Sequence, residues 1–138
     1  MRLIIFILLF PFFCLAQSQP NIIFIMSDDQ GNGEFGFRDA NWYTPNIDSL
    51  KRNGALINRF KVHPSCTPTR TALMTGRYPW RAGLGERVIL EYDGVRQLPT
   101  TTQNLAEKLK ELGYYTGIIG KWHLGHAQAE MLPISKGS

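Results

Sequence analysis

Residues 64–76 read P-S-C-T-P-T-R-T-A-L-M-T-G, and this stretch predicts a helix with a cysteine at its start. Thr67 followed by Pro68 is typical of an N-cap and the first helical residue, because the first turn of a helix has no use for the N–H group that proline lacks. Gly76 is typical of the residue that ends a helix. We therefore expect Cys66 just outside a helix N-terminus, where the helix dipole favours an anion.

The segments on either side of this helix predict alternating strands and helices. Residues 21–27 are an apolar run of strand length, typical of a strand that is buried on both faces, and residues 55–62 and 114–119 also read as strands. Proline, threonine and glycine signals predict further helices over residues 44–54 and 100–113. The order of these elements favours an α/β fold with a largely parallel sheet flanked by helices.

Polar side chains with possible chemical roles follow each predicted strand. Asp28 and Asp29 follow the first strand, Cys66 follows the second, and Lys121 and His123 follow the third. Because ligands bind at the carboxyl ends of strands in such sheets, these segments are expected to converge at one edge. Adjacent carboxylates are typical ligands of calcium or magnesium, although both aspartates can bind one ion only if the backbone turns at that point.

The sequence around Cys66 leaves several kinds of thiol chemistry open. Arg70 is too close to Cys66 in sequence for the phosphate loop of a tyrosine phosphatase. A thiol protease needs a histidine base, and His63, His123 and His126 are candidates with no assigned order. A small buried cysteine without any reaction is also common.

The N-terminus predicts a secreted chain. Residues 1–16 begin with Met-Arg, continue as an apolar run and end in a small residue, which is typical of a cleaved signal peptide and too short for a comfortable transmembrane helix. Cleavage would remove Cys14 and leave Cys66 without a disulfide partner, which is typical of a reactive or intermolecular thiol. The net charge of +4 is compatible with a solvated surface or with anionic substrates.

Three of these segments together resemble motifs of the type I sulfatase family. C-T-P-T-R-T-A-L-M-T-G at residues 66–76 resembles the motif that directs oxidation of its cysteine to formylglycine. G-Y-Y-T-G-I-I-G-K-W-H at 113–123 resembles the second family motif, and N-I-I-F-I-M-S-D-D at 21–29 resembles the N-terminal strand with its metal-binding aspartates. G-K-W-H-L-G at 120–125 is most similar to arylsulfatase B-like members. The resemblance implies an alkaline-phosphatase-like α/β fold.

The resemblance also implies the nucleophile and the metal. Position 66 would be oxidised by a formylglycine-generating enzyme in the secretory pathway, and its hydrated aldehyde would attack the sulfur of a sulfate ester. Asp28, Asp29 and the modified residue 66 would be calcium ligands. The expected substrate is a sulfate ester, for example on a sulfated glycosaminoglycan, in the lysosome or the extracellular space. Neither a nucleic-acid partner nor a stable membrane anchor is expected.

Basic side chains would complete the site that the resemblance implies. Arg70 would hold and polarise the modified residue 66, Lys121 would bind that residue and the sulfate, and His123 would assist the elimination of sulfate. Family members are several times longer, so residues 17–138 would be the N-terminal part of a truncated catalytic domain with little activity alone. The alternatives are a phosphonate or phosphate monoester hydrolase on the same scaffold, and a non-catalytic fragment that binds glycans or a partner.

Overall fold

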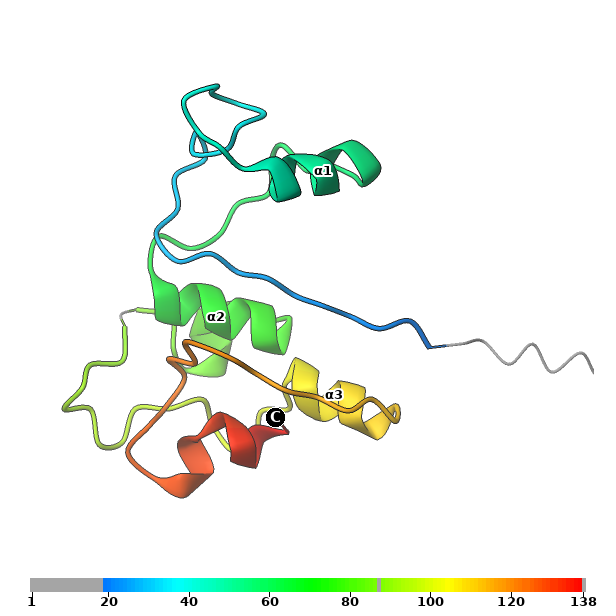
Figure 1. Ribbon diagram of the computed structural model, residues 1–138. Coiled ribbons are helices and arrows are strands. Elements are labelled where there is room, and N and C mark those ends of the chain that lie inside the picture. Colours follow the sequence, from blue (N-terminus) through cyan, green and yellow to red (C-terminus); the bar gives the residue numbers. More distant parts are fainter. Residues whose placement is uncertain (1–18, 87, 138) are drawn as a thin grey trace, which may run out of the picture. The chain divides into compact units, whose positions relative to one another are not determined.

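The computed structural model describes residues 19–86 and 88–137, so the predicted signal peptide and Cys14 lie outside the described residues. The contacts divide the chain into two units, Met1–Gln30 and Gly31–Ser138. All the helices of the described residues belong to the second unit, which is the unit that contains Cys66 (Figure 1).

No strand is assigned within residues 19–86 and 88–137, so the predicted sheet stays a prediction. Residues 21–27 were expected to be buried on both faces, but Ile23 and Ile25 are 85% and 81% exposed. The third predicted strand contains Ile119, which is fully exposed. A strand is defined by hydrogen bonds to a neighbour, and an apolar run by itself does not provide that neighbour.

The three α-helices overlap the ranges that the sequence predicts. Helix α1 spans Pro45–Asn53, α2 spans Cys66–Thr75 and α3 spans Leu105–Glu111; short 3-10 helices are η1 at Pro79–Ala82, η2 at Ala129–Met131 and η3 at Pro133–Lys136. Thr44 is the N-cap residue of α1, as predicted, but its hydroxyl donates to Asp48 and accepts from the Gly36 amide at 2.8 Å. The cap residue therefore ties α1 to the loop that precedes it.

Helix α2 begins two residues earlier than predicted. Ser65 is the N-cap, with an extended backbone, and Cys66 is the first helical residue rather than a residue outside the helix. Thr67 was expected to be the cap, but its hydroxyl makes tertiary hydrogen bonds instead. Pro68 then occupies the third helical position, where no intrahelical N–H bond is lost.

The start of α3 is also different from the prediction. Residues 100–102 were expected to supply the cap, but Asn104 does so. Its Oδ1 accepts hydrogen bonds from the amides of Ala106 and Glu107, while the Glu107 carboxylate accepts from the Asn104 amide at 2.8 Å. This reciprocal capping box satisfies more of the unbonded amides than a threonine hydroxyl alone can. Gly113, with φ of 87°, closes the helix as predicted.

A small apolar core lies beside α2. Its buried members come from η1, from the chain that follows η1 and from residue 124: Ala82, Leu84, Ile89, Leu98 and Leu124. Met74 of α2 and Trp122 pack against this cluster. The Leu98 amide donates to the Leu124 carbonyl oxygen at 2.7 Å. Helix α2 contacts η1 and α3 (Figure 1). The core therefore fixes the segment around Trp122 next to the helix that begins at Cys66.

Candidate functional site

Cys66 carries a free thiol at the first position of α2 and is half-buried. The first turn of a helix presents unbonded N–H groups and the positive end of the helix dipole. A negative charge that forms on the side chain at position 66 is therefore stabilised by the backbone.

The segment 121–123 is bound to this helix by two side chains of α2. Nη1 of Arg70 donates to the carbonyl oxygen of Lys121 at 2.5 Å, and the Thr67 hydroxyl donates to the carbonyl oxygen of His123 at 3.2 Å. The structure thus brings together the parts of the chain that carry Cys66, Arg70, Lys121 and His123. Cys66 and Arg70 lie at least 51 positions before Lys121 and His123 in the sequence.

The imidazole of His123 is held in one orientation. Nε2 donates to the carbonyl oxygen of Ile89 at 2.6 Å, and because a carbonyl oxygen only accepts, Nε2 carries the hydrogen. Nδ1 is buried and has no hydrogen-bond partner among the described residues. In the neutral ring Nδ1 is therefore a proton acceptor. The backbone of His123 has φ of 60°, in the left-handed region that non-glycine residues rarely adopt.

Sequence reasoning missed Thr67 and Ile89 as parts of the site. Thr67 is 0% exposed, and its hydroxyl also accepts a hydrogen bond from the Ile89 amide at 3.1 Å. Ile89 acts through its backbone, so no residue type in the sequence marks it. Thr67 was read as a local helix cap, and the hydrogen bonds that it makes reach across 22 and 56 positions.

The aspartate pair belongs to the first unit, Met1–Gln30, and the structure defines its local geometry. Asp29 has φ of 56°, so the backbone turns at the second aspartate itself. The sequence prediction requires the backbone to turn at this point before both carboxylates can bind one ion, and the left-handed conformation of Asp29 is a turn of this kind. Residues 19–86 and 88–137 contain no group of three or more histidine, cysteine, aspartate or glutamate side chains arranged to hold a metal ion.

The other histidines make contacts outside this arrangement. The ring of His63 lies 5.9 Å from the ring of Trp80, and its carbonyl oxygen accepts from the Thr69 hydroxyl at 2.9 Å. Nε2 of His126 is 3.0 Å from the carbonyl oxygen of Glu91. Neither contact orients an imidazole towards the thiol in the way that a thiol protease requires.

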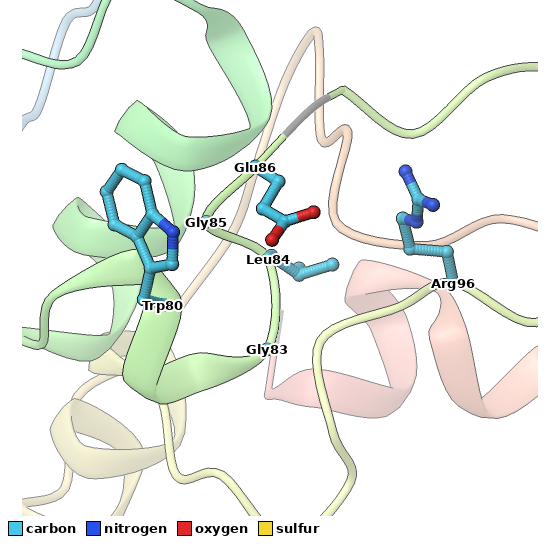
Figure 2. A pocket seen from close by; sticks show the side chains of 6 residues that line it. All are labelled: Trp80, Gly83, Leu84, Gly85, Glu86 and Arg96. Carbon is cyan, nitrogen blue, oxygen red and sulfur yellow. The ribbon is translucent and has the colours of Figure 1, made fainter.

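A pocket of about 180 Å³ lies where the chain leaves η1 (Figure 2). It is lined by Trp80, Gly83, Leu84, Gly85, Glu86 and Arg96. Figure 2 shows the Glu86 carboxylate between the side chains of Trp80 and Arg96. Nη1 of Arg96 donates to the carbonyl oxygen of Val88 at 3.4 Å, which links the wall of the pocket to the segment that contains Ile89.

Across the described residues, the helices are all too short or too polar to cross a membrane.

Comparison with known proteins identifies the family. The sequence profile of the sulfatase family matches residues 20–132. The chain belongs to the sulfatase family. This confirms the family that the motifs resemble, and it supports the predicted fold class without showing the sheet. The assignment to arylsulfatase B-like members stays a prediction.

Several curated relatives share this family. The chain is 38% identical to arylsulfatase J of Mus musculus over 88% of its length, 45% identical to steryl-sulfatase of Homo sapiens over 80%, and 47% identical to arylsulfatase A of Bos taurus over 80%. It spans only 20%, 20% and 22% of these relatives, respectively. The solved structure titled "Crystal structure of Ps i-CgsB" is 35% identical and superposes with a TM-score of 0.72, covering 87% of this chain and 27% of that one.

Proposed function

We propose that this chain carries the nucleophile of a sulfuric ester hydrolase, and that Cys66 becomes this nucleophile after oxidation to formylglycine. The observation that carries the proposal is the attachment of segment 121–123 to the N-terminal half of α2 through Arg70 and Thr67. This attachment joins the segment that carries Lys121 and His123 to the helix that carries Cys66 and Arg70, and it supports the proposal in a chain of the sulfatase family.

The position of residue 66 suits a group that must carry negative charge. The hydrated aldehyde of formylglycine supplies one hydroxyl that accepts the sulfuryl group from the ester and a second hydroxyl that allows sulfate to leave. The N–H groups of the first turn of α2 stabilise an anionic oxygen at this position. Arg70, four residues later on the same helix, adds a positively charged guanidinium.

Lys121 and His123 have complementary tasks in this proposal. The hydrogen bond from Arg70 to the Lys121 backbone keeps two cationic residues next to each other, which suits a dianionic sulfate. The His123 ring donates from Nε2 to a backbone oxygen, so only Nδ1 is available to take a proton. His123 is therefore suited to remove a proton while sulfate is released.

Calcium fits the aspartate pair in kind but not in number. Asp28 and Asp29 offer carboxylate oxygens, and the turn at Asp29 allows both to face one side. With an oxygen from residue 66 they remain short of the six to eight ligands that calcium prefers. When bound, calcium would supply positive charge to polarise the sulfate oxygens. Asp28, Asp29 and residue 66 are the residues of this chain that would hold it.

The proposal also includes a cellular route. Oxidation of Cys66 requires a formylglycine-generating enzyme as a partner, and the predicted signal peptide would bring the chain into the secretory pathway where that enzyme acts. A lysosomal or extracellular location and a sulfated glycan as the source of the ester follow from this route.

Peptide mass spectrometry tests the nucleophile directly. Trypsin releases residues 62–70 from the chain, with cleavage after Lys61 and Arg70. In chain secreted from cells that contain the modifying enzyme, this peptide should show the mass loss that accompanies conversion of CH₂SH to CHO. It should also form an oxime with hydroxylamine.

Two variants control this measurement. Pro68→Ala retains the thiol but breaks the modification motif, so its peptide should keep the mass of cysteine. Cys66→Ala removes the sulfur and should give no oxime. An unmodified thiol in secreted wild-type chain would refute the proposed nucleophile.

A further inference from the structure

Hydrogen bonds join Thr67, Ile89 and His123 in a closed ring. The Thr67 hydroxyl donates to the His123 carbonyl oxygen at 3.2 Å and accepts from the Ile89 amide at 3.1 Å. The Ile89 carbonyl oxygen then accepts from Nε2 of His123 at 2.6 Å. The ring therefore connects the first turn of α2, the segment after the pocket and the segment that contains Lys121 and His123.

Thr67 uses both hydrogen-bonding functions of its hydroxyl group in this ring. The side chain is fully buried, so water cannot replace either bond. Valine has nearly the same shape as threonine but can neither donate nor accept. It would leave the Ile89 amide and the His123 carbonyl oxygen without the partner that each has in the wild type.

This ring of hydrogen bonds also determines the tautomer of the His123 imidazole. Its backbone is strained, with φ of 60°, and such a conformation persists only where the surrounding contacts hold it. One contact of the ring holds the backbone of His123 through its carbonyl oxygen, and another holds its imidazole through Nε2. Together they fix the Nε2–H tautomer and leave the buried Nδ1 as the acceptor.

We propose that Thr67 is a positioning residue, which holds His123 as the Nε2–H tautomer beside the first turn of α2. The role of His123 in the reaction rests on the proposed function. The hydrogen-bond ring of Thr67, Ile89 and His123 does not depend on that reaction. The threonine of C-T-P-T-R then has a role that is separate from the modification of Cys66.

NMR spectroscopy of the full chain tests this proposal without any need for turnover. Nitrogen chemical shifts of the imidazole report the tautomer, and amide exchange reports the Ile89 bond. Wild type should show the Nε2–H tautomer of His123. Thr67→Val should give a mixture of tautomers and an Ile89 amide that exchanges on the order of tenfold faster. Thr67→Ser, which keeps the hydroxyl, should behave as the wild type.

Thr71→Val is the matched control. Thr71 is also 0% exposed on α2, but its hydroxyl donates within the helix to the Thr67 carbonyl oxygen at 2.8 Å. The same substitution there should loosen the helix slightly and leave the His123 tautomer unchanged. A tautomer change of equal size in Thr71→Val would show general loosening and would refute the positioning role.

Other outcomes also decide the question. If wild-type His123 is protonated on Nδ1, the proposal is wrong, even if Thr67→Val does not fold. If Thr67→Ser loses the tautomer, the hydroxyl is not the cause and the proposal is wrong. The mass of peptide 62–70 does not depend on the tautomer, so a cysteine mass there refutes the proposed function alone.

Discussion

Arg70 donates a hydrogen bond from Nη1 to the backbone carbonyl oxygen of Lys121, at 2.5 Å. Arg70 is the one residue of α2 with a long side chain that donates hydrogen bonds, and its planar guanidinium offers several fixed donors. The contact joins the cysteine motif to the second family motif through the backbone, so it does not depend on the conformation of the Lys121 side chain.

Arg70→Lys should therefore weaken the attachment of segment 121–123 while the charge is kept. Hydrogen bonds to charged groups contribute about 1.5–3 kcal/mol, so we expect amide exchange in residues 121–123 to rise by roughly tenfold or more. Hydrogen exchange measured by mass spectrometry would check this. Arg38→Lys is the control, because Arg38 lies over the Phe37 ring and should leave this exchange unchanged. Equal exchange in wild type and Arg70→Lys would contradict the role of this contact.

Asn104→Ala should destabilise the chain more than a simple loss of a helix cap. Asn104 is 2% exposed, and its Nδ2 also donates to the Lys136 carbonyl oxygen at 2.8 Å. Loss of the cap costs about 1 kcal/mol, and the broken bond to residue 136 adds about 1 kcal/mol more. Urea denaturation would measure the free energy of unfolding. Thr101→Ala, at an exposed position in the segment first expected to cap α3, should change it by less than about 0.5 kcal/mol.

Gly85→Ala should disturb the pocket next to η1. A Cβ atom at residue 85 would lie 2.5 Å from ring carbons of Trp80 and 2.7 Å from its backbone nitrogen, so the indole must move. We expect a loss of about 1–3 kcal/mol in the free energy of unfolding and a change in tryptophan fluorescence. Gly94→Ala provides the comparison, because nothing lies within 4 Å of a Cβ atom there. If both variants unfold at the same urea concentration, the close contact at residue 85 does not lower the free energy of unfolding and the prediction is wrong.

Glu111 gives the structure a small pH dependence. A hydrogen bond from Lys108, at 2.7 Å, lowers the pKa of Glu111 below its ordinary value of 4.5. Since the folded-state pKa is the lower one, ionised Glu111 favours the folded state above pH 4.5, and this contribution is lost as the pH falls through the lowered value. Lys108→Met should raise the pKa of Glu111, which a carbon NMR titration of its carboxyl group would detect. In Lys110→Met the titration should match the wild type.

Calcium should leave the thermal midpoint of this chain unchanged at millimolar concentration. Asp28 and Asp29 supply too few oxygens for a tight site, and the described residues show no larger cluster. Differential scanning fluorimetry with calcium, with magnesium and with chelator would measure the midpoint. A clear rise with calcium that Asp29→Ala abolishes would contradict this expectation, and it would show that the chain alone completes a calcium site.

The helices could be predicted from local signals because capping chemistry is local. Thr44, Pro45, Gly76 and Gly113 lie at or next to helix ends, as their side chains or the lack of one predict. The starts of α2 and α3 were wrong by a few residues, because each has several candidate cap residues in a row. The Thr67 hydroxyl does not cap α2 because it forms hydrogen bonds with Ile89 and His123, which are distant in the sequence.

The residue types of the candidate site stay a prediction from the sequence, and the geometry around them could not be predicted from it. The motif resemblance indicates Cys66, Arg70, Lys121 and His123, and the structure holds their segments together. The contribution of Ile89 comes from a backbone N–H and C=O, which every residue except proline has. Strand pairing could not be predicted from single segments, because it is a relationship between segments that no one segment encodes.

The left-handed backbone at His123 has a consequence for variant libraries. Glycine adopts this conformation without strain and asparagine adopts it more easily than most residues, but both lose the hydrogen bond from the imidazole to the Ile89 carbonyl oxygen. In a library selected for abundance, the rank of glycine and asparagine against histidine would show which of these two effects is larger. A library selected for turnover by an enzyme containing this segment should retain histidine, so a difference between the two rankings would separate the structural use of the imidazole from its chemical use.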